Sequence, residues 1–212
     1  MPYLQSLQSL LARTILAVCL LSGAAQAWAA PLYSVSIDTA TLGSGPAYLG
    51  LYFMGLADAA PATATVDNLT GALTGAASVA GTVTGTAPGP LVFGNGNGGS
   101  DWVQAITLGG MFSFDVSFAL AAGDAGTTFG WALFDDAGYL GGDGDLGAIS
   151  LQPGAGPGAI YQLANQSALS QVTVVPEPST AALLLLAGVG MTWTARRRRQ
   201  VDGHRHGRAY SI

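Results

Sequence analysis

Apolar and polar residues alternate with a period of two through the middle of the chain. The clearest case is FSFDVSFAL, residues 112–120, where phenylalanine, valine and leucine alternate with serine, aspartate and alanine. Such a nine-residue run predicts a strand with one buried face, and YSVSID, residues 33–38, has the same pattern. Six further stretches, rich in β-branched and aromatic residues, are also predicted strands: 47–54, 102–108, 127–134, 146–152, 159–163 and 168–175.

Clusters of turn-forming residues separate these stretches. FGNGNGGSD, DDAG and GGDGD contain the Gly, Asn and Asp residues that favour turns. Residues 63–90 form a tract of Thr, Ala and Gly, part of which is expected to be an edge strand and the rest a mobile loop. No stretch between residues 31 and 175 has a helical period with caps. About eight short strands at this spacing predict an all-β fold, an antiparallel β-sandwich that is jelly-roll-like.

The first residues have a different pattern. Residues 1–29 are predicted to be a secretory signal peptide, because Arg13 precedes a short apolar segment, residues 14–23. The following AQAWA contains two overlapping cleavage patterns. We therefore expect cleavage after Ala29 or, as an alternative, after Ala27.

The C-terminal part consists of three consecutive segments. They are the motif Val175, Pro176, Glu177, Pro178, the uncharged run 179–195, and the arginines Arg196, Arg197, Arg198 and Arg199. As a helix the uncharged run would span about 25 Å, which is enough for a thin hydrocarbon core. Because arginines stay on the cytoplasmic side, we expect the body, residues 30–174, outside the membrane and residues 200–212 as a short cytoplasmic tail.

This order of segments resembles the PEP-CTERM sorting signal of exported proteins in Gram-negative bacteria. The resemblance implies that an exosortase, an integral-membrane transpeptidase-like enzyme, recognises the chain and cuts it near the motif. It also implies a route. The body lies in the periplasm while the tail is anchored in the inner membrane, and it then reaches the cell surface or an exopolysaccharide matrix. Residues 200–212 depart from the family pattern, which usually ends soon after its arginines.

The body is similar to a recurrent passenger of such proteins. The stretches that carry this resemblance are IDT, FSFDVSF, FGWALFDDAG and LGAISL, within residues 33–174. That passenger family has no established activity, so the resemblance implies an all-β fold and nothing more.

The charge of the body excludes several function classes. Between Pro31 and Val175 the chain has ten Asp and no Lys, Arg, His or Glu, and the one cysteine is Cys19. Without cations the body cannot neutralise phosphates, which excludes nucleic-acid binding. Without His or Cys it has no catalytic triad and no typical zinc ligands. We therefore expect no enzyme, although a glycoside-active site built from paired aspartates is an alternative.

Calcium is the cofactor that the aspartates could hold. In GGDGDLG, Asp143 and Asp145 are two residues apart, and the glycines would let backbone carbonyls approach a cation. Asp135 and Asp136 lie on the preceding turn. Two interpretations are open: a metal-free turn, or a Ca²⁺ site formed by these four aspartates. No other cofactor is expected.

Aromatic residues suggest a second kind of binding. Five of them could stack on sugar rings if they were exposed: Trp102, Trp131, Tyr48, Tyr52 and Tyr139. The alternation instead places Trp131 in the core, beside Phe129 and Leu133. The predicted function is therefore an exported surface or matrix protein with a structural or adhesive role. The expected partners are exosortase, as the processing enzyme, and exopolysaccharide. The alternatives are a carbohydrate-binding or Ca²⁺-dependent module and, on the Thr-rich TVTGT stretch, an ice-binding protein.

Overall fold

The computed structural model describes residues 31–121, 126–152, 154, 161–165, 167–175 and 188. Residues Ala30–Val175 form a compact unit of their own. The predicted signal peptide, membrane helix and cytoplasmic tail lie outside the described residues, apart from Gly188. In the part of the chain that is described, no helix is long and apolar enough to cross a membrane.

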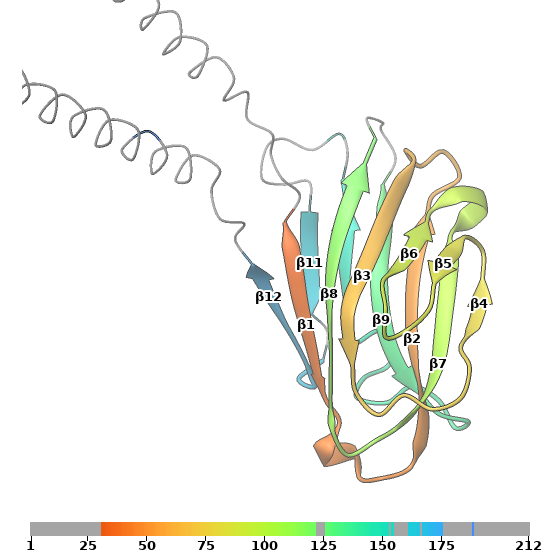
Figure 1. Cartoon of the computed structure of the whole chain (residues 1–212), viewed down its shortest axis with the longest axis vertical. Coiled ribbons are helices and arrows are strands. Elements are labelled where there is room, and N and C mark those ends of the chain that lie inside the picture. The colour runs from red at the N-terminus through yellow and green to blue at the C-terminus, as the bar shows by residue number, and fades with distance from the viewer. Residues whose placement is uncertain are drawn as a thin grey trace, which may run out of the picture. The chain divides into compact units, whose positions relative to one another are not determined.

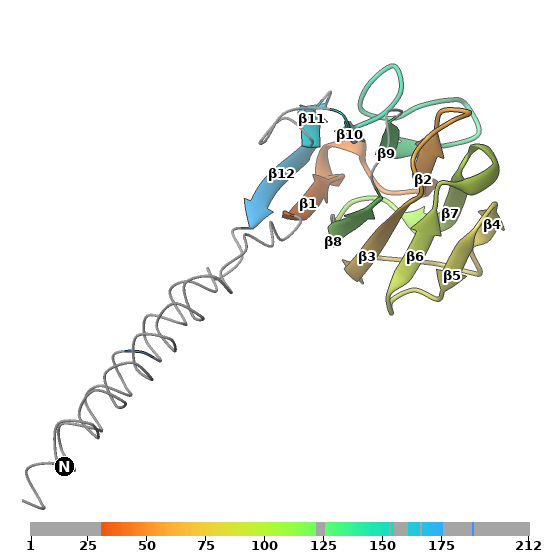
Figure 2. The ribbon, with the colours of Figure 1, turned by 90° about the horizontal axis from the view of Figure 1, so that it is seen from above.

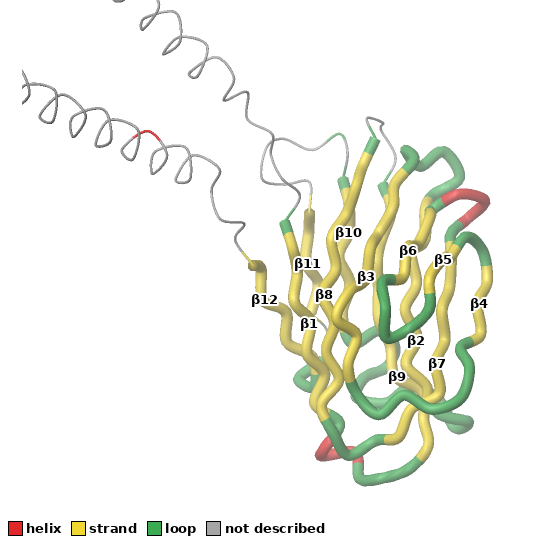
Figure 3. The backbone as a smooth tube through the Cα atoms, viewed as in Figure 1, coloured by secondary structure: helices red, strands yellow, loops and turns green. Residues whose placement is uncertain are grey.

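The described residues form twelve strands in two six-stranded sheets. Figures 1 and 3 show how the strands are arranged. In chain order the strands are β1 (Leu32–Asp38), β2 (Pro46–Gly55), β3 (Ala62–Thr70), β4 (Ser78–Ala80), β5 (Val83–Gly85), β6 (Leu91–Gly94), β7 (Ser100–Thr107), β8 (Met111–Leu120), β9 (Thr127–Phe134), β10 (Gly147–Leu151), β11 (Tyr161–Asn165) and β12 (Ser170–Val175). Short 3₁₀ turns lie at η1 (Ala40–Leu42) and η2 (Gly96–Gly98). Sheet A has the order β12-β1-β8-β3-β6-β5, and sheet B has the order β11-β10-β9-β2-β7-β4.

The strand pairs are nested in sequence. β1 pairs with β8, β2 with β7 and β3 with β6, all antiparallel. This nesting is the connectivity of a jelly roll, in which a long hairpin folds over into two sheets. β9, β10 and β11 then extend sheet B on the far side of β2, and β12 returns to sheet A beside β1 (Figure 2). The predicted antiparallel, jelly-roll-like sandwich is confirmed.

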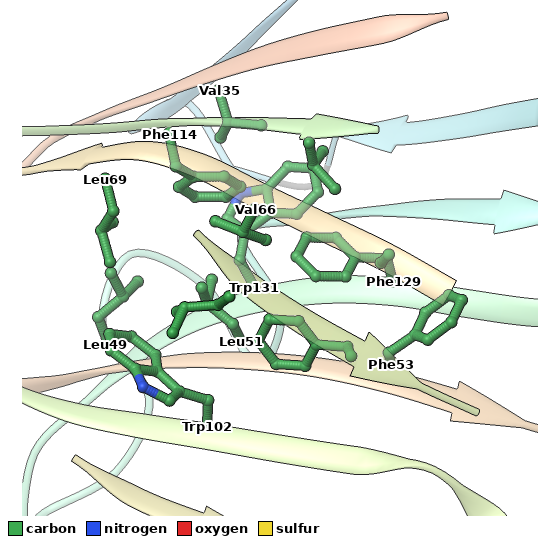
Figure 4. Packing of buried hydrophobic residues seen from close by; sticks show 14 of the residues in the cluster. Val35, Leu49, Leu51, Phe53, Val66, Leu69, Trp102, Phe114, Phe129 and Trp131 are labelled. Carbon is green, nitrogen blue, oxygen red and sulfur yellow. The ribbon is translucent and has the colours of Figure 1, made fainter. Parts of the chain in front are cut away.

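The core lies between the sheets and follows the period-two pattern. On β8 the side chains from Phe112 to Phe118 alternate between buried and half-buried. The ring of Phe129 on β9 meets Phe114 edge-on, with 6.3 Å between centroids, and it also meets Phe118 at 6.0 Å (Figure 4 shows Phe114 and Phe129). Such edge-to-face pairs add to the hydrophobic gain from burial. The aromatic side chains of the two sheets therefore interlock between the sheets and form one core.

All eight strands predicted from the sequence form, but the Thr/Ala/Gly tract differs from the prediction. β3, which the tract was expected to contribute at an edge, lies inside sheet A between β8 and β6. The inward side chains Ala62, Ala64 and Val66 are buried although two of them are small. Small inward residues such as alanine make the period-two pattern of hydrophobicity weak. In the sequence, β3 therefore looks like part of a low-complexity segment although it is paired on both sides. β4 and β5, also in this tract, do lie at sheet edges.

A bulge in β3 changes which side chains face the core. The register with β8 shifts between Asp67 and Thr70, and Asn68 has a positive φ of 55°. Asn tolerates this conformation better than most residues. After Asn68 the alternation restarts with the opposite parity, so that Leu69 is buried like Val66. The Asn68 side chain is held in place by a 2.8 Å hydrogen bond from its Nδ2 to Oδ2 of Asp115.

Candidate functional site

The sorting motif begins at the end of the folded domain. Val174 and Val175 are the last two residues of β12, where they pair with Tyr33 and Leu32 of β1. Val174 is 50% exposed, because β12 is the edge strand of sheet A. The remaining residues of the predicted motif and the arginine cluster lie outside the described part of the chain. The domain is therefore complete at the residue that precedes Pro176.

The first pair of predicted calcium ligands lies in a tight turn between β9 and β10. The carboxylate Oδ1 of Asp135 accepts hydrogen bonds from the backbone N–H groups of Ala137 and Gly138, at 2.8 and 3.0 Å. The backbone N–H of Asp135 also donates to the carbonyl of Gly138 at 2.9 Å. This carboxylate thus stabilises the turn, as Asp commonly does. Asp136 is exposed.

The second pair of predicted ligands lies further along the same loop. Asp143 is exposed, and the carboxylate of Asp145 accepts a hydrogen bond from the Tyr52 hydroxyl. Among the described residues, no group of three or more His, Cys, Asp or Glu side chains is placed to hold a metal ion. Calcium binding by Asp135, Asp136, Asp143 and Asp145 stays a prediction, which a thermal melt with and without millimolar Ca²⁺ would test.

Aromatic side chains gather on the outer surface of sheet B. We call Tyr48 and Tyr52 of β2, Phe134 of β9 and Tyr139 of the β9–β10 loop the aromatic face. Tyr48 is directly opposite Phe134 in the β2–β9 register, and their rings stack with centroids 5.4 Å apart. Tyr139 meets Phe134 edge-on at 6.4 Å. Tyr139 is 58% exposed and Tyr48 37% exposed, so both rings are accessible to solvent.

Two glycines leave space for these rings on the sheet. A Cβ atom on Gly130 would lie 2.2 Å from Cζ of Tyr52, and a Cβ atom on Gly50 would lie 3.2 Å from Cε1 of Phe134. The aromatic rings therefore occupy positions that side chains on β2 and β9 would otherwise fill. Glycine in a strand often marks such a close approach.

Two carboxylates accompany Tyr52. Asp101 of β7 is its partner in the β2–β7 register, and the Asp145 carboxylate accepts a hydrogen bond from its hydroxyl group. Burial, followed by the hydrogen bond and the nearby negative charges, raises the pKa of Tyr52 well above its usual range. Tyr52 therefore keeps its hydroxyl proton and can act as a hydrogen-bond donor.

The structure separates the five aromatic residues singled out in the sequence. Trp102 and Trp131 are buried in the core, which confirms the expectation for Trp131 and rules out direct contact with a ligand for both. Tyr48, Tyr52 and Tyr139 come together on the aromatic face. Phe134 was not singled out from the sequence. Because Phe134 is three residues after the buried Trp131, alternation along β9 places it on the outer face, and this was the signal that could have found it.

The fold and the C-terminal sequence first define a class: an all-β sandwich domain followed in the sequence by Pro-Glu-Pro, a short apolar run and four arginines. Comparison with known families then makes the class specific. The PEP-CTERM protein-sorting motif matches residues 174–199, so this chain is a protein that carries a PEP-CTERM sorting signal. The match includes the predicted motif and all four arginines of the cluster. It marks the protein for exosortase-dependent export. No curated protein and no solved structure matches the chain.

Proposed function

We propose that this protein is a non-enzymatic component of the cell surface or extracellular matrix, with a structural or adhesive role. In this proposal the body enters the periplasm while the tail is anchored in the inner membrane. An exosortase then cuts near the motif and releases or transfers the body. The observation that carries the proposal is the sorting motif at residues 174–199, which begins in the last strand of the sandwich.

The pairing of the first and last strands supports this route. Leu32 at the start of β1 is directly opposite Val175 at the end of β12. Removal of the predicted signal peptide and cleavage after Val175 would both leave every described strand in the released body. The product would therefore keep its complete core and could persist outside the cell.

The residue inventory supports a role without catalysis. Between Pro31 and Val175 the chain has no His, Lys, Arg or Cys, which supply most general acids, bases and nucleophiles in enzymes. The Asp135 and Asp145 carboxylates are hydrogen-bonded to the turn and to Tyr52.

The experiment that tests the sorting route replaces both prolines of the motif. Proline lacks an amide hydrogen and resists helix and sheet, which keeps the motif extended for an enzyme cleft. We expect the double variant Pro176→Ala with Pro178→Ala to accumulate at full length in the membrane fraction. The measurement is immunoblotting of fractions from cells that contain an exosortase.

The matched control is the double variant Ser179→Ala with Thr180→Ala, which changes the next two residues and leaves Pro-Glu-Pro intact. This control should be processed like the natural chain. Normal processing of the proline variant, or unchanged processing in cells that lack the exosortase, would contradict the proposed route.

Carbohydrate binding is the second candidate function. The observation that favours it is the aromatic face, which brings exposed rings and carboxylates together on one side of the domain.

A further inference from the structure

The aromatic face has no role in the sorting route, yet it is partly exposed. We propose that this face binds an uncharged polysaccharide, with sugar rings stacked on Tyr48 and Tyr139. The inference rests on the matrix location proposed above, and it adds the class of ligand and the residues that contact it.

The arrangement of the rings supports stacking on sugars. The carbon-bound hydrogens of a pyranose ring form an apolar face that packs on an aromatic ring. Tyr48 and Tyr139 both contact Phe134, at 5.4 and 6.4 Å between ring centroids. Both tyrosines keep a substantial exposed fraction, 37% and 58%. The face therefore offers two accessible rings, both in contact with Phe134, on which sugar rings could stack.

The rings are also held in position before any ligand arrives. Tyr52 lies against Gly130, and Phe134 lies against Gly50, where a Cβ atom would clash with or crowd the ring. The β9–β10 loop that carries Tyr139 is held by bonds on both sides of this residue: the Gly138 N–H donates to the Asp135 carboxylate, and the Leu140 N–H donates to the Leu133 carbonyl. A surface ordered in advance loses less conformational entropy on binding.

Polar groups beside the rings could bind sugar hydroxyl groups. Asp101 of β7 is directly opposite Tyr52 in the β2–β7 register, and Asp145 of the β9–β10 loop is also close to Tyr52. An ionised carboxylate has two oxygens that accept hydrogen bonds from hydroxyl donors. The aromatic face thus combines apolar platforms with directional acceptors, as ligand sites in proteins generally do.

Charge selects the kind of polysaccharide. The segment from Pro31 to Val175 has ten aspartates and no Lys, Arg or His. It cannot pair with the carboxylates or sulfates of an acidic polysaccharide, and Asp101 and Asp145 would repel them. The ligand class that fits both the rings and the charge is therefore an uncharged glycan.

The test is affinity electrophoresis of the full-length chain in a polyoxyethylene detergent, which has no sugar headgroup. Native gels contain hydroxyethyl cellulose, galactomannan or alginate, and serum albumin serves as the reference for mobility. We expect the protein to be retarded in at least one neutral gel and to migrate in alginate as it does without polysaccharide. The double variant Tyr48→Ala with Tyr139→Ala should lose at least about tenfold in affinity for the polysaccharide, because it loses both accessible rings.

The matched control is Met111→Ala with Leu56→Ala. It removes two exposed apolar side chains, 55% and 69% exposed, that are not part of the aromatic face. The control should be retarded like the natural chain. Three results would overturn the proposal: no retardation in either neutral gel, equal retardation of the tyrosine variant and the control, or stronger retardation in alginate.

A third variant moves a ring without removing one. Gly130→Ala places a Cβ atom where Tyr52 now lies, so it should displace this ring and weaken binding less than the double variant does. Thermal melting checks that each variant is folded.

The two proposals can fail separately. The Tyr48→Ala, Tyr139→Ala variant keeps Pro176 and Pro178, so it should be processed normally even though it loses glycan binding. If the proline variant is not processed but still binds the neutral polysaccharide, then glycan binding does not depend on the sorting route.

Discussion

At the scale of single residues, Asn95 is a polar side chain that connects three parts of the core. It is 8% exposed, and its Nδ2 donates to the Ala60 carbonyl and to Oγ1 of Thr127, both at 2.7 Å. Its Oδ1 accepts a 3.0 Å hydrogen bond from the backbone N–H of Ala62. This amide thus ties the end of β6 to the segment before β3 and to the start of β9. Nothing in the NGNGGSD sequence distinguishes Asn95 from the exposed Asn97.

Replacing Asn95 should therefore be costly. In Asn95→Ala the backbone groups of Ala60 and Ala62 lose their partner in a buried place, and we expect a loss of about 3 kcal/mol in the free energy of unfolding. Thr127→Val removes only one of these bonds and should cost about 1 kcal/mol. The measurement is urea unfolding of the full-length chain. Equal midpoints for Asn95→Ala and the natural chain would show that the three hydrogen bonds contribute little.

At the scale of elements, β12 is held in two ways. It pairs with β1 over six positions, from Leu32 opposite Val175 to Ile37 opposite Ser170. At the far end of this pairing, Nε1 of Trp131 on β9 donates to Oγ of Ser170 at 2.9 Å. This bond joins sheet B to sheet A through the core. The strand in which the sorting motif begins is therefore anchored at its other end, away from the motif.

Ser170→Ala should weaken this anchor. The variant leaves the Trp131 indole N–H buried without this acceptor, which should lower the free energy of unfolding by about 2 kcal/mol. Ser36→Ala, a change to a half-buried serine on β1, is the control and should have little effect. Urea unfolding followed by tryptophan fluorescence measures both. A loss no larger than that of the control would mean that the indole finds another acceptor.

At the scale of the whole molecule, the stability of the sandwich should depend on pH in an unusual way. Between Pro31 and Val175 there is no His, Lys or Cys, so no side chain ordinarily titrates between about pH 6 and 9. Above that range the tyrosines matter. Burial raises the pKa of Tyr33 and Tyr161, as it does for Tyr52.

A raised tyrosine pKa means that the folded state keeps a proton which the unfolded state releases. The stabilisation is then complete below the unfolded value of about 10 and is lost as the pH rises above it. We expect a melting temperature that is constant from about pH 6 to 9 and falls above about pH 10. Tyr52→Phe removes one of these groups and should reduce the alkaline slope. Circular dichroism melts at each pH provide the measurement, and a steady decline already between pH 7 and 9 would contradict this account.

The alternation of residues predicted most of the strands, and the structure shows why it could not predict the rest. A strand with large inward residues, such as β8 with Phe112 and Phe114, gives a strong period-two signal. β3 has small inward residues and a bulge at Asn68 that reverses the parity, so its central place was not visible. β4 and β5 have three residues each, too few for a period to appear.

The order of segments along the chain determined the sorting signal of this protein, because a Pro-Glu-Pro motif, an apolar run and an arginine cluster are read as linear sequence. The alternation also determined that Trp131 faces inward. Only the tertiary structure brought Tyr48 and Phe134 together, through a β2–β9 register between residues far apart in the chain. Local patterns specify which face of a strand is apolar. Strand pairing depends on the competition among all strands for partners, and that competition is settled when the whole sandwich packs.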